Sequence, residues 1–301
     1  MRLKLNYIAA MAFALAVAAC SDDDIKPSED NQLVVFPQGN ADYDADIVDI
    51  YNMYGTQMLY DYNDEMFRWQ ITDKLGYIST PANQPADKAH IKDAIAFMRR
   101  NCFDFYDQDS LKSILPYRIY LASNLGKIFE YSGTNASGVY VNIKDTIPNI
   151  AAVNGYRNIC FGIVNGRLSS MSEDSLRLTK GELNAAILAS AVDRGVMRVP
   201  ESFSSLEVEN ANWTNEPGSN GYNNYGLLEY LSAKSMTPTE DFASYLKMLI
   251  AYPKDEFNRR FTTKTFDISG RIAKKADAVR KWMKEQYGID VEKIAESEVN
   301  K

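Results

Sequence analysis

Residues 185–200 read AAILASAVDRGVMRVP, and this stretch decides how the chain is interpreted. It starts with small apolar residues at helical spacing, reaches a glycine at Gly195 and stops at Pro200. Apolar residues that recur every three or four positions predict a packed helix, and a glycine followed by a proline is typical of a helix end. The stretch therefore predicts a buried helix, at about residues 178–194, with almost no group that performs chemistry.

The segments around this helix predict a mixed fold. Further helical spacing occurs at 46–60, 86–102, 238–252 and 268–287, the last with Trp282 on its apolar face. Between 117 and 168 the pattern changes to short β-rich runs, which are YRIYLAS, GVYVNI, RNICFGIV and RLSS. Asn165-Gly166 lies between the last two runs and is a strong hairpin signal. Helices, a small sheet and more helices give an α+β order.

Composition limits the possible functions. The chain has 301 residues, of which 46% are hydrophobic and 24% charged, so it is long enough to bury a substantial core. Its formal net charge is −7, and no stretch of clustered lysine and arginine appears. Nucleic-acid binding needs such a basic surface, so we expect no nucleic-acid partner.

The first twenty residues, MRLKLNYIAAMAFALAVAAC, resemble a bacterial lipoprotein signal. Arg2 and Lys4 precede an apolar run that ends in small residues, which is the anatomy of a secretory signal. The final VAAC resembles a lipobox, whose cysteine is acylated and becomes the first residue of the mature chain. We therefore predict that Cys20 is lipidated and anchors the protein in a membrane.

The domain organisation follows from this signal. We expect a signal peptide over residues 1–19, an acidic flexible tether over 20–32 and one α+β domain over 33–301. The run of aspartates directly after Cys20 resembles the export signal of surface lipoproteins in gut-type Gram-negative bacteria. The expected location is the outer membrane, facing outward.

The histidine, the cysteines and the aspartate-rich motif of the expected domain give little indication of catalysis. His90 is the one histidine, so two histidines of this chain cannot form a metal site, and we interpret it as a surface residue. Cys102 and Cys160 are too sparse to make a disulfide framework, and their pairing stays open. DYDAD at 42–46 starts like a calcium loop but lacks its later ligands, so we interpret it as the acidic start of a helix.

Three stretches resemble a known family. They are YNMYGTQMLYDYNDEMFRWQ at 51–70, RVPESF at 198–203 and SAKSMTPTEDFASYLKML at 232–249. They resemble the zinc-binding metallopeptidase lipoproteins that accompany outer-membrane nutrient importers, over about residues 45–262. The resemblance implies a zincin-like α+β fold, rich in helices with a small mixed sheet. It also implies that the helix before Pro200 carries an H-E-x-x-H motif, whose histidines bind zinc and whose glutamate is the general base.

This chain departs from the family at those positions. Counting back from Pro200 by the family's spacing places the first histidine, the glutamate and the second histidine on Ile187, Leu188 and Ala191. None of these side chains offers a lone pair to a metal. We call them vestigial metal-site positions, and we expect no cofactor and no catalytic residue there.

Two other groups of residues are candidates for a cleft. Thr237, Pro238 and Glu240 form a complete capping box, which explains Glu240 without a binding role, and Asp241 suits the first turn of a helix. In the family the matching acidic motif lies near the metal cleft. Exposed aromatic rings can bind a peptide or glycan ligand, and the polar loop at 212–226 supplies three, which are Trp213, Tyr222 and Tyr225. The alternative is that these rings only anchor their own loop.

Three functions remain open from the sequence. The favoured one is a non-catalytic, metallopeptidase-like lipoprotein that serves as a binding or accessory subunit beside a nutrient importer. The second is a hydrolase that uses carboxylates without zinc, with Glu240 and Asp241 facing Glu201 or Glu207. The third is a purely structural outer-membrane lipoprotein without a ligand.

Overall fold

The computed structural model describes residues 35–63, 65–67, 79–134, 137–147, 149–208, 217–219, 221–229 and 237–299. The chain divides into two units, Met1–Val35 and Phe36–Lys301, and the described elements all lie in the second. The predicted signal peptide, Cys20 and the acidic tether lie outside the described residues. Among the residues described, no helix combines the length and the apolar character that a membrane span requires.

The first helix among the described residues is α2, Asp42–Tyr54, and it is shorter than the pattern predicts. Two aspartates lie in its first turn, Asp42 and Asp44, as interpreted from DYDAD. The helix ends at Gly55, which adopts a left-handed conformation with φ of 75°. The predicted continuation to Tyr60 is therefore wrong, because residues Gln57–Leu59 instead form strand β1.

One sheet organises the middle of the chain. Its strands are β1, β2 (Ser79–Pro85), β3 (Arg118–Thr134), β4 (Tyr140–Ile147), β5 (Ala152–Asn154) and β6 (Asn158–Phe161). The first part of β3 is parallel to both β1 and β6, and β5 adds an antiparallel edge. Further along, β3 pairs antiparallel with β2 and then with β4. The sheet is therefore mixed, as expected.

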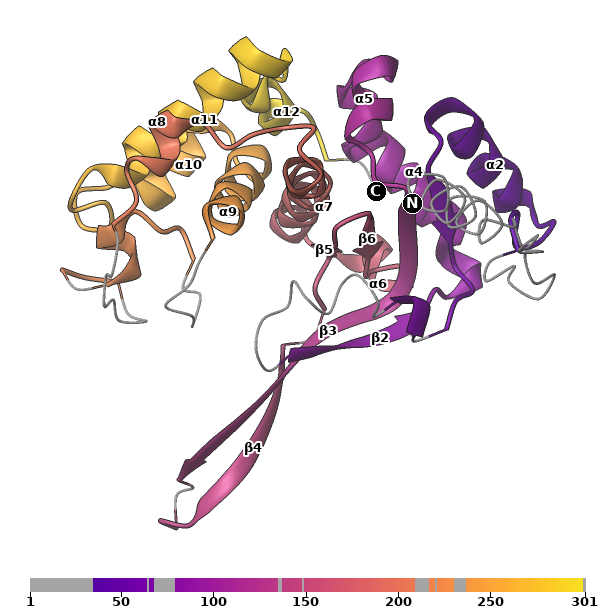
Figure 1. Ribbon diagram of the computed structural model, residues 1–301, viewed down its shortest axis with the longest axis horizontal. Coiled ribbons are helices and arrows are strands. Elements are labelled where there is room, and N and C mark those ends of the chain that lie inside the picture. The colour runs from indigo at the N-terminus through magenta and orange to yellow at the C-terminus, as the bar shows by residue number, and fades with distance from the viewer. Residues whose placement is uncertain are drawn as a thin grey trace, which may run out of the picture. The chain divides into compact units, whose positions relative to one another are not determined.

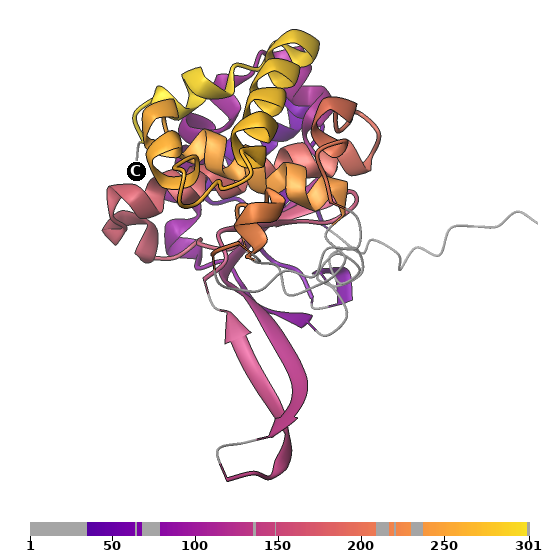
Figure 2. The ribbon, with the colours of Figure 1, turned by 90° about the vertical axis from the view of Figure 1, so that its left-hand side faces the viewer.

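The long strand β3 continues into a projecting hairpin. Its pairing with β4 runs from Lys127↔Ile147 to Thr134↔Tyr140, whereas its pairing with β2 stops at Ser79↔Phe129. Figures 1 and 2 show this ribbon extending away from the helices. Tyr140, near its tip, is 73% exposed.

The predicted hairpin at Asn165-Gly166 is wrong. Gly166 has φ of −63° and precedes a short helix, α6 (Arg167–Ser170), so RLSS is helical and not a strand. A tight two-residue hairpin turn needs positive φ, which Gly166 does not adopt. The Asn165 side chain instead accepts a hydrogen bond of 2.8 Å from the Arg167 backbone N–H. This contact starts the helix.

The remaining elements are mostly helical. Between β2 and β3 lie η2 (Lys88–His90), α4 (Ile91–Asn101), η3 (Phe103–Phe105) and α5 (Gln108–Ile114). After the sheet come α7 (Glu173–Asp193), α8 (Glu201–Ser204), η4 (Tyr222–Tyr225), α9 (Pro238–Ala251), α10 (Lys254–Phe261), α11 (Arg271–Tyr287) and α12 (Val291–Glu296). The predicted helices at 86–102, 178–194, 238–252 and 268–287 are confirmed to within a few residues, apart from the earlier start of α7.

Helix α7 is the centre of the fold. It lies between β5 and β6 on one side and α9 on the other (Figure 1). Gly181 allows the close approach to α9, because a Cβ atom at that position would lie 2.3 Å from the Lys247 carbonyl oxygen. The apolar core extends across both sides of α7, and the architecture is α+β, as predicted.

Candidate functional site

The predicted acidic pair at the start of α9 divides into two roles. Glu240 is exposed, and its carboxylate accepts hydrogen bonds from the backbone N–H of Thr237, at 2.8 Å, and from the Thr237 hydroxyl, at 2.9 Å. The Glu240 backbone N–H donates in return to the Thr237 hydroxyl oxygen, at 3.3 Å. This is the predicted capping box, so Glu240 begins the helix and has no visible binding role.

Asp241 points into the protein instead. It is only 2% exposed, and its Oδ2 atom lies 2.5 Å from the Nζ atom of Lys275 on α11, which is fully buried. The second carboxylate oxygen, Oδ1, is also buried and has no hydrogen-bond partner within the described part of the chain. A buried ion pair therefore joins α9 to α11, and no local sequence pattern indicates it.

Glu207, which follows α8, lies near this pair. Burial raises the pKa of the Asp241 carboxyl to about 6, against the attraction of Lys275, and the negative charge of Glu207 adds to the rise. Burial also raises the pKa of Glu207, and Lys275 again acts in the opposite direction. Its Oε1 atom has no partner among the described residues. The charge of Lys275 thus acts on two carboxyl groups, and only Asp241 contacts it.

Aromatic rings surround the ammonium group of Lys275. Its Nζ atom lies 4.9 Å from the ring centroid of Phe203 and 5.8 Å from that of Tyr245. The two rings meet edge to face, with centroids 5.1 Å apart, and the Tyr245 hydroxyl donates a 2.8 Å hydrogen bond to the Gly226 carbonyl. The Asp241 carboxylate is buried in this cluster and is shielded from a substrate. The cluster stabilises the junction of α8, α9 and α11.

The vestigial metal-site positions on α7 belong to the apolar core. Ile187, Leu188 and Ala191 are fully buried, in the same apolar cluster as Phe242 and Tyr245 of α9. Their side chains carry no nitrogen, oxygen or sulfur atom, so they do not fit a metal ion. Whether this face of α7 turns toward the start of α9 stays a prediction.

The first half of α7 is more polar than the sequence pattern indicates. Asn184 is fully buried and donates to the carbonyl of Asn101, at 2.9 Å, while it accepts from the Tyr106 hydroxyl, at 2.7 Å. Glu182 accepts from the Ala151 backbone N–H, at 2.9 Å, and lies 3.2 Å from the Nζ atom of Lys247. These contacts hold the sheet and α9 against α7.

Lys180, on α7, is the second buried lysine of the described chain after Lys275 of α11. Its Nζ atom donates to the carbonyl oxygens of Ile294, at 2.8 Å, and Ser297, at 3.2 Å. Burial lowers the pKa of Lys180 to about 8, and the nearby Arg177 lowers it further. The charge compensates the carbonyl end of α12 and fixes the last helix to α7.

The aromatic loop is only partly described. Trp213 lies outside the described residues, whereas Tyr222 and Tyr225 are half-buried in η4. The Tyr222 ring meets Phe266 edge to face, with centroids 6.3 Å apart. The two tyrosines therefore pack on the domain, and they do not form a freely exposed pair of rings.

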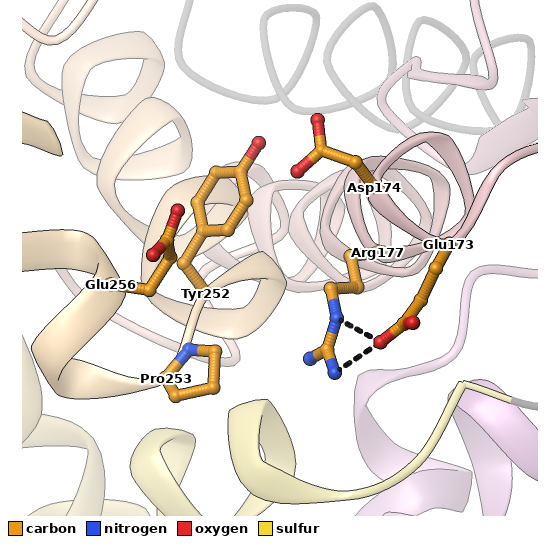
Figure 3. Close-up of a pocket in the computed structure, with 6 residues that line it drawn as sticks. All are labelled: Glu173, Asp174, Arg177, Tyr252, Pro253 and Glu256. Atoms are coloured by element: carbon orange, nitrogen blue, oxygen red, sulfur yellow. Dashed lines mark hydrogen bonds and ion pairs between the residues drawn. The ribbon is translucent and has the colours of Figure 1, made fainter.

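A cavity of about 430 Å³ lies where α7 begins, at a place that no sequence motif indicates. Figure 3 shows its lining, which comes from the first turns of α7 and from the junction of α9 and α10: Glu173, Asp174, Arg177, Tyr252, Pro253 and Glu256. The cationic groups near it are engaged, because Arg177 contacts Glu173 at 2.8 Å and Arg260 contacts Asp174 at 3.0 Å. The cavity is a charged surface hollow.

The other sequence candidates lie apart from this region. His90 is partly exposed, 3.8 Å from Asp87 and 3.7 Å from Asp93, in keeping with a surface histidine. Cys102 and Cys160 are buried free thiols, and burial raises the pKa of both. Glu201 is exposed at the start of α8. Across the described ranges, no three histidine, cysteine, aspartate or glutamate side chains gather into a possible metal site.

Comparison with known proteins gives one weak likeness. No protein-family model matches the chain, and no curated protein matches it. Among solved structures, a crystal structure called a "putative zinc-binding metallo-peptidase" from Bacteroides caccae is similar with a TM-score of 0.47 and 14% identity. The alignment covers 85% of this chain and 92% of that one.

Proposed function

We propose that this chain is a lipid-anchored protein of the outer membrane, facing outward, and a non-catalytic binding or accessory subunit of a nutrient-import system. In this proposal it has a zincin-like fold and descends from metallopeptidase lipoproteins that bind zinc. Its partners are the membrane, through Cys20, and an importer complex, with a peptide or glycan as ligand. The lipobox and the acidic segment after it support the location.

One observation carries the non-catalytic part of the proposal. Ile187, Leu188 and Ala191 are fully buried in apolar core, where the family resemblance places a histidine, a glutamate and a histidine. A polar cleft that loses its ion leaves unpaired polar groups, which are costly to bury. Apolar replacements remove this cost and join α7 to the core.

The pairing of Asp241 supports the same view. The resemblance places its acidic motif near a metal cleft, and here the carboxylate instead faces the ammonium group of Lys275, at 2.5 Å. The chain thus supplies its own positive charge at this carboxylate. Among the described residues, Asp241 belongs to no group of three histidine, cysteine, aspartate or glutamate side chains that could hold a metal ion.

The carboxylate hydrolase has less support. Of its four proposed residues, Glu201 and Glu240 are exposed, and Glu240 is used in a helix cap. Asp241 does lie near Glu207, but it is only 2% exposed and paired with a lysine. General acid–base catalysis needs a carboxyl group within hydrogen-bond reach of the substrate, and this one is enclosed.

Cell fractionation tests the anchoring directly. We expect a Cys20→Ser variant to lack the lipid and to appear in the soluble periplasmic fraction or the medium, while Ser21→Ala remains with the outer membrane. Surface protease treatment of intact cells then reports whether the wild-type protein faces outward. A Cys20→Ser protein that still fractionates with the outer membrane would contradict the proposal.

A further inference from the structure

An aromatic and basic patch lies at the end of the sheet where β3 and β6 begin. We define this Tyr/Arg patch as Tyr117, Arg118, Tyr156, Arg157 and Arg194. Tyr117 is 52% exposed and Tyr156 is 46% exposed, and Arg157 is also exposed. Large exposed tyrosines beside arginines are unusual for a surface that serves solubility alone, and the chain as a whole carries a net charge of −7.

The sheet fixes the spacing of these residues. β3 and β6 are parallel, with Arg118 opposite Asn158, and the Arg118 backbone N–H donates to the Arg157 carbonyl, at 3.2 Å. Tyr117 precedes Arg118 and Arg157 precedes Asn158, so the two residues are neighbours at the starts of adjacent strands. The usual strand spacing places their backbones about 5 Å apart. The Ser190 hydroxyl of α7 donates to the Tyr156 carbonyl, at 3.4 Å, and anchors the turn.

The guanidinium groups add positive charge around the two rings. The Cζ atom of Arg118 lies 5.3 Å from the ring centroid of Tyr117, and that of Arg157 lies 5.8 Å from the centroid of Tyr156. Arg194, at the end of α7, donates to the Ile114 carbonyl and interacts electrostatically with Tyr156. The five residues lie at one end of the sheet. The Arg118 guanidinium also donates to the Gln57 side chain, at 3.2 Å, and that of Arg194 donates to backbone carbonyls.

This composition fits a protein partner. Tyrosine and arginine are the residue types that dominate binding energy at protein interfaces, and arginine binds carboxylates with two parallel hydrogen bonds. The cavity at the start of α7 includes no patch residue.

We propose that the Tyr/Arg patch docks an acidic segment of a partner protein. Carboxylates of the partner pair with Arg157 and Arg118, and the tyrosine rings cover the backbone between them. The contact is partly ionic, so it weakens as salt rises. This inference does not depend on the lipid anchor, on the zincin-like fold or on the importer.

Binding of poly-L-glutamate to the full-length protein tests the proposal. We expect fluorescence anisotropy of labelled poly-L-glutamate to report binding at low salt that weakens in about 0.5 M salt. Arg157→Glu and Tyr156→Ala should each weaken binding about tenfold or more, as at interface hot spots. Two matched controls should bind like the parent. They are Lys274→Glu, with the same change in charge, and Tyr51→Ala, with loss of another partly exposed ring.

Two results would overturn it. The first is no binding of poly-L-glutamate, or binding that Lys274→Glu weakens as much as Arg157→Glu, which would reflect overall charge. The second is binding of polygalacturonate but not of poly-L-glutamate, which would assign the patch to an acidic glycan. Circular dichroism of each variant confirms that the fold is retained, so that a loss of binding reports the patch itself.

Discussion

The ammonium nitrogen of Lys275 lies 2.5 Å from a carboxylate oxygen of Asp241, and both side chains are enclosed between α9 and α11. Taking two charges out of water is costly, and their attraction compensates this cost only while both partners are present. The pair therefore makes the two helices dependent on each other. Asp241 is one of the two carboxylates that the sequence offered as cleft candidates, and here it is engaged by Lys275.

Removing one partner should be far more harmful than replacing both. We expect Lys275→Met to lower the free energy of unfolding by about 3–5 kcal/mol, because Asp241 then stays buried without its counter-ion. The double variant Asp241→Leu and Lys275→Met should recover much of that loss. Urea unfolding of the three proteins measures both effects. A single variant within about 1 kcal/mol of the parent would mean that the pair is open to water.

The pH dependence of stability should reveal the raised pKa of Asp241. The pKa of the Asp241 carboxyl is about 6 in the folded protein, compared with 3.8 for an aspartate in the unfolded chain. Folding therefore favours the protonated form. The stabilising contribution is complete below about pH 4 and is lost as the pH rises through 6. The stability of the parent relative to Asp241→Asn should therefore fall between pH 4 and pH 7, by up to about 3 kcal/mol.

A comparison of variants isolates this carboxyl from the others that titrate in the same range. Asp49→Asn, at an exposed position of α2, controls for the loss of one negative charge. If the stability of the parent relative to Asp241→Asn rises with pH, the attraction of Lys275 outweighs burial. That result would refute the upward direction of the pKa shift.

Gly181→Ala should distinguish helix propensity from helix packing. In an exposed helix this change stabilises by about 0.5–1 kcal/mol. Here the new Cβ atom would lie 2.3 Å from the Lys247 carbonyl oxygen, which is backbone and cannot move aside cheaply. We expect a loss of about 1–3 kcal/mol in thermal or chemical unfolding. A stabilised variant would show that α7 and α9 do not approach closely.

Ile187→His should destabilise the protein, because the position is fully buried in apolar core. An unpaired polar ring and the lost apolar contacts cost about 2–4 kcal/mol. Val196→His, just past the end of α7 and 41% exposed, is the matched control and should change stability by less than about 0.5 kcal/mol. Equal stability of the two variants would remove Ile187 from the core.

Patterns of local sequence predicted several elements well. The capping box of Thr237 and Glu240 marked the start of α9 because both partners lie within one helical turn. The same local logic failed at Asn165-Gly166, where the polar side chain of Asn165 begins a helix and the expected turn does not form. Helical spacing also placed Gln57–Leu59 in a helix. Gly55 ends that helix, and the segment pairs with β3 as a strand instead.

Contacts between distant residues were not predictable. Lys275 lies on a charged, lysine-rich helix, where every lysine suggests a solvated face, yet it meets a carboxylate 34 residues away in the chain. Asn184 and Lys180 interrupt an apolar helix pattern, and only tertiary contacts with Asn101 and Ile294 explain their burial. The strand Ser79–Pro85 contains two prolines, which argue against a strand by sequence alone.

The zinc content of the protein tests the central claim most directly. The claim is that α7 is packed core and that Asp241 is paired with Lys275, so that neither provides a zinc site in the described part of the chain. Elemental analysis of protein purified without chelators, after exposure to zinc and extensive dialysis, should find far less than one zinc per chain. About one tightly held zinc per chain, retained through dialysis, would contradict this claim.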